Sequence, residues 1–593
     1  MKMTGIQGMI EKFVAKPLTS AARREMEGSR SAGRLKSGIK IQHQAFGDFF
    51  VHEDRSFAGV RAERLSKYTS YTVSEGFQRE TEKIYIAKLL QSATWKLDLR
   101  LIPTMGLFYF LSELCRLSIS FQSDLKTDDS QYTLAILATL IPLILVEIPS
   151  NFIMRRIGAR IFFPVILTFT GILIFCHAFL SNYTGLLVAR FLVGLVNGGL
   201  FPGFLLYLSS FYTRSELQWR MALFYCTGCL AGGLSGTFAY TLTRLDGALG
   251  LAGWAWVFIV EFFSPSSREI VKIIVEQVSD IYTGKNCKLK KIEGMLTVLG
   301  GSVGFYLFPS SLDDAGFLTA DEKKAVCERL HRDRSPVAAG SLLDEKPFRS
   351  SGFQIWQAIR SPHVGLCCLA FFFAGTNVNS LTYFQPSILN SLGYGPSVSR
   401  VMSIPPYAVA FVTVLLSSYL SDRHQSRAMV AVVSGGVTAI GYSIFYISDD
   451  SSLKYGSLFL TVIGSYGIIP SLAAWMSNNS EPYARKATSL ALGPIAANLG
   501  GLISDLLFPN PDQSNFSVAF MVNIVFAILT IVTCLINLGY LTYVEAVKIH
   551  RRDEVLQHYA LDDYSVDASV EELLYLNGWE YLGDRHPDFR YTF

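Results

Sequence analysis

Two arginines of this sequence lie in long apolar runs, where charged side chains are rare. Arg116 closes the run that begins at Leu101, and Arg190 lies within "LLVARFLVGLVNGG". A guanidinium stays charged and offers a planar fork that binds a carboxylate through parallel hydrogen bonds. In an apolar environment it is costly unless it faces a cavity or a partner. Arg116 and Arg190 are therefore the candidates for binding an anionic ligand.

Carboxyl groups occur in the same kind of run. The candidates are Glu113, Glu147, Glu261 and Asp505. Because desolvation disfavours the charged form, a carboxyl group in such a run takes up a proton more readily than one in water. These acids are thus candidates for proton coupling. The alternative interpretation is that each acid holds a neighbouring arginine or a backbone donor.

Amide and hydroxyl groups gather in a third apolar run, "FFFAGTNVNSLTYFQPS". Asn379 and Tyr383 are four residues apart and share one face of a helix, and Gln385 follows them. We expect these three residues to offer hydrogen bonds to a ligand opposite the arginines. The alternative is that they bond neighbouring helices to one another.

The elements that position these residues follow from the composition. Of the 593 residues, 50% are hydrophobic and 17% are charged. A helix of about 20 apolar residues crosses a bilayer. Such runs recur and predict an all-α polytopic membrane protein with spans at 101–121, 132–152, 161–180, 184–210, 219–243, 253–309, 362–386, 401–420, 427–447, 456–476, 486–507 and 516–544.

The short loops between the spans alternate in charge. Basic residues stay on the cytoplasmic side of a membrane. The basic loops carry Arg155, Arg156 and Arg160, then Arg214 and Arg220, then Arg423 and Arg427, and then Arg485 and Lys486. We therefore expect both termini of this multi-pass protein to be cytoplasmic; a location in the plasma membrane is implied only by the family resemblance described below.

The spans and loops predict five regions. Residues 1–96 are polar and are expected to form a disordered cytoplasmic tail. Residues 97–309 and 362–547 are expected to form two halves of six helices each, and residues 548–593 a second cytoplasmic tail. The cytoplasmic linker 310–361 contains Thr319 and Glu322, whose spacing is that of a capping box and predicts a short helix.

The sixth span is interrupted. Residues 253–263 are too few to cross a bilayer, but 253–261 and 294–309 together make about 25 residues. The polar stretch 262–292 is therefore expected to be an insertion, either a re-entrant device, an extruded loop with an amphipathic helix, or a segment that is not native. Its many lysines argue against burial at membrane depth. We favour translation of an unspliced intron, because its removal restores a full span.

The plan of two six-helix halves resembles the major facilitator superfamily. The run "RFLVGLVNGGLFPG" is similar to a signature of its fourth span, and "NFIMRRIGAR" and "SYLSDRHQSR" resemble its gating loop. The resemblance implies gating roles for Arg156, Arg160, Asp422, Arg423 and Arg427. In the first loop Arg155 replaces the usual acid. The alternative is that these residues only anchor the loops on the cytoplasmic side.

A narrower resemblance covers most of residues 90–593. The runs "EIPSNFIMRRIGAR", "GLAGWAWVFIVE", "AAWMSNNSEPYARKATSLALGPIAANLGG" and "HPDFRYTF" are similar to those of the fungal anion:cation symporters, the group of allantoate, nicotinate, pantothenate and biotin permeases. It implies proton-coupled uptake of a small organic anion, and a gating role for Trp475, Asn478 and Asn479. Two acids usual in that family are replaced here, by Cys115 and Asn197.

These observations predict a secondary active transporter that works by alternating access. The alternative is a non-transporting relative, a nutrient sensor or an inactive carrier, because of the lost acids and the split sixth span. No nucleotide loop, nucleophile motif or metal-ligand spacing favours an enzyme. We expect no catalytic or metal-binding residues and no cofactor. The expected partners are an anionic substrate, protons and the lipid bilayer, without nucleic acid, and the expected state is a monomer.

Overall fold

The computed structural model describes residues 55–117, 129–177, 183–244, 304–333, 351–507, 517–552 and 582–593. The chain divides into two compact units, Met1–Ala87 and Lys88–Phe593. The contacts that build the site all belong to the second unit.

The apolar runs before residue 245 form helices. They are α4 (Arg55–Leu117), α6 (Asp129–Ile157), α7 (Ala159–His177), α8 (Tyr183–Asn197), α9 (Leu200–Phe211) and α10 (Leu217–Arg244). A helix satisfies every backbone polar group within the segment, which is what an apolar environment requires. We call these helices, with α4 taken from Lys88 onward, the N-terminal group.

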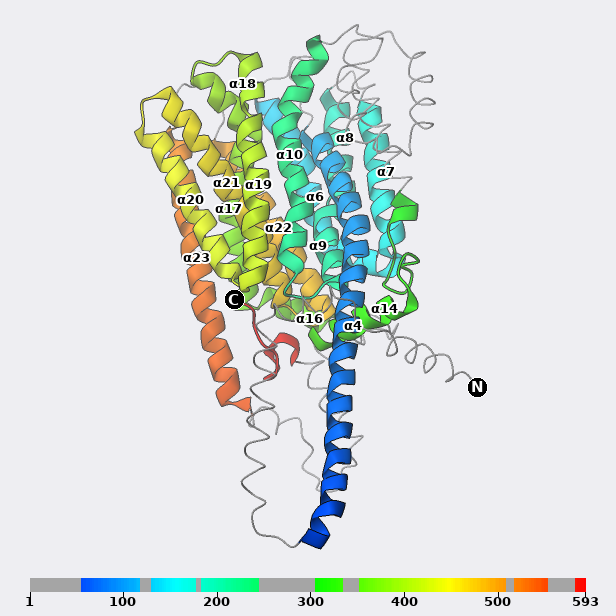
Figure 1. Cartoon of the computed structure of the whole chain (residues 1–593). Helices are drawn as coiled ribbons and strands as arrows, with labels where there is room; N and C mark the ends of the chain where they lie inside the picture. Colours follow the sequence, from blue (N-terminus) through cyan, green and yellow to red (C-terminus); the bar gives the residue numbers. More distant parts are fainter. Residues whose placement is uncertain are drawn as a thin grey trace. The chain divides into compact units, whose positions relative to one another are not determined.

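The runs after residue 361 form a second set. They are α17 (Pro362–Ser391), α18 (Pro396–Met402), α19 (Ile404–His424), α20 (Arg427–Ile447), α21 (Ser451–Asn478), α22 (Tyr483–Leu507) and α23 (Ser517–His550). We call them the C-terminal group. Figure 1 shows α10 of the N-terminal group beside α19 of the C-terminal group, and α6 packs against α22 in the same way.

Eight described stretches are long and apolar enough to cross a membrane, the pair α8 and α9 counting as one. Ala159–Ile174 is a shorter apolar helix. The predicted fold class of an all-α polytopic membrane protein is confirmed. The predicted sixth span lies outside the described residues except for 304–309, as does the whole of the stretch 262–292.

Close approach between helices depends on small residues in the fourth predicted span. A Cβ atom on Gly194 would lie 2.0 Å from the carbonyl oxygen of Thr139, and one on Gly198 would lie 2.5 Å from that of Leu143. Any larger residue would push α8 away from α6, which is the packing role that small residues have in membrane proteins.

An aromatic core joins the N-terminal group to the chain beyond its undescribed stretch. The ring centroid of Phe308 lies 5.1 Å from that of Phe108 and 5.2 Å from that of Phe163. Phe163 in turn packs on Phe204 at 4.5 Å. Residues 304–308 therefore return the chain to the N-terminal group before it enters the linker.

The described part of the linker contains two short helices, α14 (Ala320–Asp333) and α16 (Ser351–Ile359). The predicted capping box opens α14, because the Thr319 backbone N–H donates to Glu322 Oε2 at 2.9 Å and the Glu322 N–H donates to Thr319 Oγ1 at 3.3 Å. That prediction is confirmed. Glu322 is also held by Lys96 of α4 at 2.8 Å.

One prediction is wrong and two need refinement. Residues 55–96 are helical, so the expectation of a disordered tail is wrong there; the contacts of Ser92 and Lys96 with Glu322 stabilise the last part of this stretch. The predicted fourth span is present as one stretch, Tyr183–Phe211, and the structure adds a break at Gly198 and Gly199 between α8 and α9. The eighth span begins at Ile404 rather than 401, because the two following prolines favour the first turn of a helix.

Candidate functional site

A cavity of about 110 Å³ lies between the two helix groups. Its wall is built by α4, α6, α8, α9 and α10 on one side and by α17, α21 and α22 on the other. Aromatic rings cover much of the wall, among them Tyr109, Tyr225, Phe371 and Tyr466. A few polar groups in a mostly apolar cavity are typical of a site for a small molecule.

Two of the predicted proton-coupling acids lie on this wall. Glu147 of α6 is 1% exposed, and its Oε1 accepts a hydrogen bond of 2.8 Å from Nδ2 of Asn498 on α22. Glu113 of α4 is half-buried on the same wall. Glu261 lies outside the described residues, and so does the side chain of Asp505. The cavity thus brings Glu113 and Glu147 together.

Among the predicted ligand-binding residues, Asn379 lies on the wall. Its Nδ2 donates to the Gly375 carbonyl oxygen one turn earlier, at 2.8 Å. Tyr383 is half-buried and Gln385 is fully buried, and within the described part of the chain neither lines the cavity. They lie on α17 beyond Asn379.

The two arginines are placed differently by the structure. Arg190 of α8 is 4% exposed and is not one of the described residues on the cavity wall. It precedes Gly194 by one turn, and Gly194 lies against Thr139 rather than against the part of α6 that faces the cavity. Arg116 lies near the end of α4, one turn after Ser112 of the wall, and its side chain is outside the described residues.

The sequence did not point to Asn498, and it pointed to Asn197 only as the replacement for an acid that is usual in the family it resembles. Asn498 lies in the run "GPIAANLGG", whose small residues read as a packing face. Asn197, at the break between α8 and α9, accepts a hydrogen bond of 2.7 Å from Thr170 Oγ1. Both amides line the cavity. The signal that could have found them is a lone amide among small apolar residues, which marks a polar group that needs a partner or a cavity.

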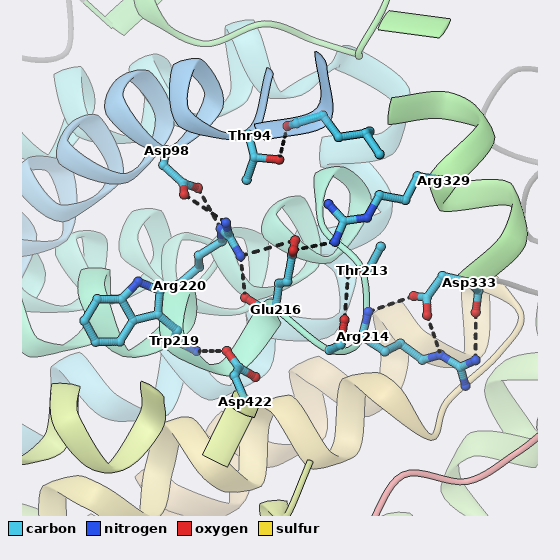
Figure 2. Close-up of polar contacts among 12 residues, drawn as sticks. Thr94, Asp98, Thr213, Arg214, Glu216, Trp219, Arg220, Arg329, Asp333 and Asp422 are labelled. Atoms are coloured by element: carbon cyan, nitrogen blue, oxygen red, sulfur yellow. Dashed lines mark hydrogen bonds and ion pairs between the residues drawn. The ribbon is translucent and has the colours of Figure 1, made fainter. Parts of the chain in front are cut away.

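A carboxylate of the C-terminal group caps a helix of the N-terminal group. Asp422 at the end of α19 accepts a hydrogen bond of 2.7 Å from the Trp219 backbone N–H in the first turn of α10 (Figure 2). A negative charge at a helix N-terminus is favourable because the first N–H groups have no partner in the helix. Asp422 also forms an ion pair with the fully buried Arg427.

The corresponding contact between α6 and α22 uses the guanidinium of Arg155 where the contact between α19 and α10 uses a carboxylate. Arg155 at the end of α6 lies over the ring of Tyr483, at 4.5 Å from the ring centroid, and Tyr483 begins α22. Such a contact is a cation–π interaction. Of the predicted gating residues nearby, Arg160 donates to the Phe305 carbonyl oxygen at 3.1 Å, whereas Arg156 and Arg423 are exposed.

The last residues of the chain dock at this end of the helices. We call Leu582–Phe593 the C-terminal segment. Trp475 Nε1 donates to the Thr592 carbonyl oxygen at 3.0 Å, and Asn479 accepts from the Thr592 N–H at 2.8 Å. Asn478 reaches the N-terminal group, because its amide donates to the Arg214 carbonyl oxygen at 2.9 Å.

Further contacts tie the C-terminal segment to both helix groups. The Arg427 backbone N–H donates to the Phe593 oxygen at 2.6 Å, and Arg485 forms an ion pair with Asp584. Arg214, between α9 and α10, donates to the Arg590 carbonyl oxygen at 3.0 Å and lies over the ring of Phe589. The segment therefore bridges the two groups at the end that carries the basic loops.

An ionic network joins α14 to the same end. Arg220 of α10 binds both carboxylate oxygens of Asp98 on α4, at 2.6 and 2.8 Å, and Glu216 pairs with Arg329 of α14 (Figure 2). The Arg214 N–H donates to Asp333 at 2.7 Å. Burial acts to raise the pKa of Glu322 at the start of α14, but hydrogen bonds from Lys96, the Thr319 N–H and Ser92 lower it to about 2.

The chain is similar to known transporters. A model of the Major Facilitator Superfamily matches residues 101–263, 292–505 and 367–559, and leaves 264–291 unmatched. An uncharacterized transporter of Schizosaccharomyces pombe is 25% identical over 471 residues, covering 77% of this chain and 85% of the relative. The high-affinity nicotinic acid transporter of Saccharomyces cerevisiae is 24% identical over 506 residues, covering 84% of each chain.

A solved structure has the same fold. The proton:xylose symporter XylE, bound to 6-bromo-6-deoxy-D-glucose, superposes with a TM-score of 0.51 at 12% sequence identity, covering 73% of this chain and 94% of that chain. With the family model matching more than half of its residues, this chain belongs to the Major Facilitator Superfamily of membrane transporters.

Proposed function

We propose that this protein takes up a small organic anion together with protons, by alternating access of the central cavity to the two sides of the membrane. The observation that carries the proposal is the pair of carboxyl groups, Glu113 and Glu147, on the wall of a small cavity shared by both helix groups. A binding site between two halves of the protein, at mid-depth, is the arrangement that alternating access requires.

Glu147 is the principal proton site in this proposal. It is almost fully buried, and burial makes protonation of a carboxyl group more favourable. When Glu113 and Glu147 are both charged they repel an anion, so uptake of protons prepares the cavity for an anionic substrate. Proton binding and anion binding therefore favour each other, which is the energetic basis of symport.

Arg116 is the first candidate for the anion, because it follows Glu113 on α4 by three residues and Ser112 of the cavity wall by four. Asn379 is the hydrogen-bonding candidate on the opposite wall. Arg190, Tyr383 and Gln385 belong to the proposal as residues that reach the substrate in another conformation. The 24% identity to a nicotinic acid transporter supports a carboxylate substrate of similar size.

The basic loops are proposed to face the cytoplasm, with both termini on that side. The docked C-terminal segment, the Asp422 cap and the Arg155 contact then form a closed cytoplasmic gate, in which Trp475, Asn478 and Asn479 take part. The stretch 262–292 is proposed to be an insertion in the sixth span. The unmatched residues 264–291 of the family comparison support this.

Uptake assays test the proposal. Labelled nicotinate, allantoate, biotin and pantothenate are supplied to cells that lack their own carriers and express either the full chain or a chain without 262–292. We expect uptake of at least one anion to rise as the external pH falls. Glu147→Gln, a neutral residue of the same size, is expected to remove that pH dependence. Surface-expressed protein that takes up none of the anions would favour a sensor or an inactive carrier.

A further inference from the structure

Three contacts join α6 of the N-terminal group to α22 of the C-terminal group. Glu147 accepts from Asn498 at 2.8 Å, Asn151 Nδ2 donates to the Ala487 carbonyl oxygen at 2.8 Å, and Arg155 stacks on Tyr483 at 4.5 Å. The α6 residues are spaced four apart and so lie on one face. The residue numbers of their partners on α22 decrease in the same order, because the two helices run antiparallel. We call this row of contacts the α6–α22 seam.

The seam runs from the cavity to the end of the helices where the C-terminal segment docks. Its contact at the cavity differs from the other two. The Asn151 bond and the Arg155 contact involve groups whose charge does not change, whereas Glu147 gains or loses a proton. A hydrogen bond from an amide to an ionised carboxylate is roughly twice as strong as one between neutral groups. The cavity end of the seam is therefore the place where proton binding changes its strength.

We propose that Asn498 is a positioning residue that links protonation of Glu147 to the opening of the α6–α22 seam. This rests on the proposed proton role of Glu147. In the closed seam, Asn498 donates to the carboxylate of Glu147 and holds the two helix groups together beside the cavity. A proton on Glu147 removes the charge, weakens this bond and lowers the cost of separating α6 from α22. Proton binding from the cavity thus favours opening of the far gate.

A second carboxyl group on the cavity wall is that of Glu113 on α4, and the phenols of Tyr109, Tyr225 and Tyr466 share the wall. Because Glu113 is a second carboxyl group on the same wall, Glu113→Gln serves as the background in which the proposal is tested.

Other charged groups lie further along the packed helices. On α8, Arg190 is at the level of residues before Thr139 of α6, about three turns from Glu147. On α22, Arg485 pairs with Asp584 and Lys486 with Glu481 at the gate end, and Asp505 follows Asn498 by about two turns. On α7, the exposed Arg160 donates to the Phe305 carbonyl oxygen. None of these ion pairs and hydrogen bonds of the described residues includes Glu147 or Asn498.

Opening of the seam can be measured by thiol labelling. Ala487 is fully buried in the closed seam, so Ala487→Cys reports its opening, and peptide mass spectrometry separates this site from the native cysteines. In the Glu113→Gln background, we expect labelling from the gate side to increase by roughly tenfold as the pH falls, corresponding to about 1.4 kcal/mol. Glu147→Gln is expected to label rapidly at every pH.

Asn498→Leu, which has similar size and no donor, is expected to label as rapidly as Glu147→Gln and to lose the pH dependence. The double variant should equal either single variant, because both remove one bond. Leu499→Ala, at the neighbouring and 42% exposed position on α22, is the matched control and should keep the parental profile.

A second variant keeps the test decisive if Asn498→Leu folds poorly. Asn498→Asp puts a second carboxyl group next to Glu147: one shared proton then makes a charge-assisted hydrogen bond that holds the seam closed, whereas two ionised carboxylates repel each other, so labelling should now increase toward high pH. Asn498→Leu or Asn498→Asp with the parental profile, alongside a Glu147→Gln without pH dependence, overturns the role of Asn498 and leaves the proposed function standing. A Glu147→Gln that keeps the parental profile overturns both.

Discussion

At the scale of single residues, the cavity wall combines acids and amides without a described cation. Glu113, Glu147, Asn197, Asn379 and Asn498 supply its carboxyl and amide groups. An amide group both donates and accepts hydrogen bonds, so it can bond to a protonated acid, to an ionised acid or to a bound anion. The chemistry of the wall therefore depends on which acids carry protons.

Asn197 offers a test of this idea, because it lies on the same wall as Glu113 and Glu147. We expect Asn197→Glu to raise the pH midpoint of uptake by about one unit, since a third carboxylate disfavours ionisation of its neighbours. The measurement is initial uptake rate against external pH. Asn197→Gln adds the same length without a charge and should keep the original midpoint; an equal shift in both variants would argue for a packing effect.

At the scale of elements, helix ends meet side chains from the other group. The Asp422 cap on α10 and the Arg155 stack on α22 occupy corresponding places, but one uses a carboxylate and the other a guanidinium. The C-terminal segment adds Asp584, which pairs with Arg485 in the first turn of α22. Asp584 of the C-terminal segment thus supplies a carboxylate to the start of α22, where the contact from α6 is made by the cation Arg155 instead of an acid.

Loss of the Asp422 charge is expected to weaken the closed gate. Asp422→Asn leaves the fully buried Arg427 without its ion pair, and breaking such a pair costs on the order of 3 kcal/mol. The purified protein should unfold at a lower temperature, and Ala487→Cys should label faster from the gate side. Arg423→Gln changes an exposed neighbour and should do neither. A variant as stable as the parent would show that Arg427 is satisfied by its other partners.

Docking of the C-terminal segment should depend on pH through His586. Its Nδ1 accepts from the Asp588 N–H at 3.2 Å, and burial lowers its pKa from 6.5 to about 4. A released segment binds a proton near pH 6.5, so docking is fully favourable above that pH and is lost progressively toward pH 4. The shift corresponds to on the order of 3 kcal/mol.

Hydrogen exchange of residues 582–593 measured from pH 7.5 to pH 5 tests this dependence, after correction for the intrinsic exchange rate. The protection of the segment should fall as the pH is lowered. In His586→Gln, which cannot take up a proton, the fall should be absent over this range. If the variant loses protection in parallel with the parent, another group controls the docking.

At the scale of the whole molecule, the continuity of the sixth span decides whether the N-terminal group can move as one body. Residues 304–308 rejoin that group through Phe308, whereas the family comparison leaves 264–291 unmatched. We expect the chain without 262–292 to transport at least as well as the full chain at equal surface expression. Transcript sequencing across this junction should find a spliced form that lacks the stretch. Full transport by the intact chain, and none by the shortened one, would make the stretch a native part of the transporter.

The sequence by itself determined the fold class, most helix positions and the capping box of α14. Apolar runs of spanning length and the Thr319–Glu322 spacing are local patterns, and local patterns are sufficient to specify a helix that satisfies its own backbone. It also singled out Glu113, Glu147 and Asn379, because polar side chains stand out in apolar runs. The sequence did not reveal the helix over 55–96 or the break at Gly198 and Gly199.

Only the tertiary structure decided which polar residues meet. Glu147 and Asn498 are 351 positions apart, and Trp475 meets Thr592 across 117. Nothing local to either residue specifies such a pair, because it depends on how α6, α21, α22 and the C-terminal segment pack together. The same packing keeps Arg190 and Gln385 off the described cavity wall and brings Asn498 onto it. Helices follow from short-range patterns, but a binding site between two helix groups follows from the contacts that join them.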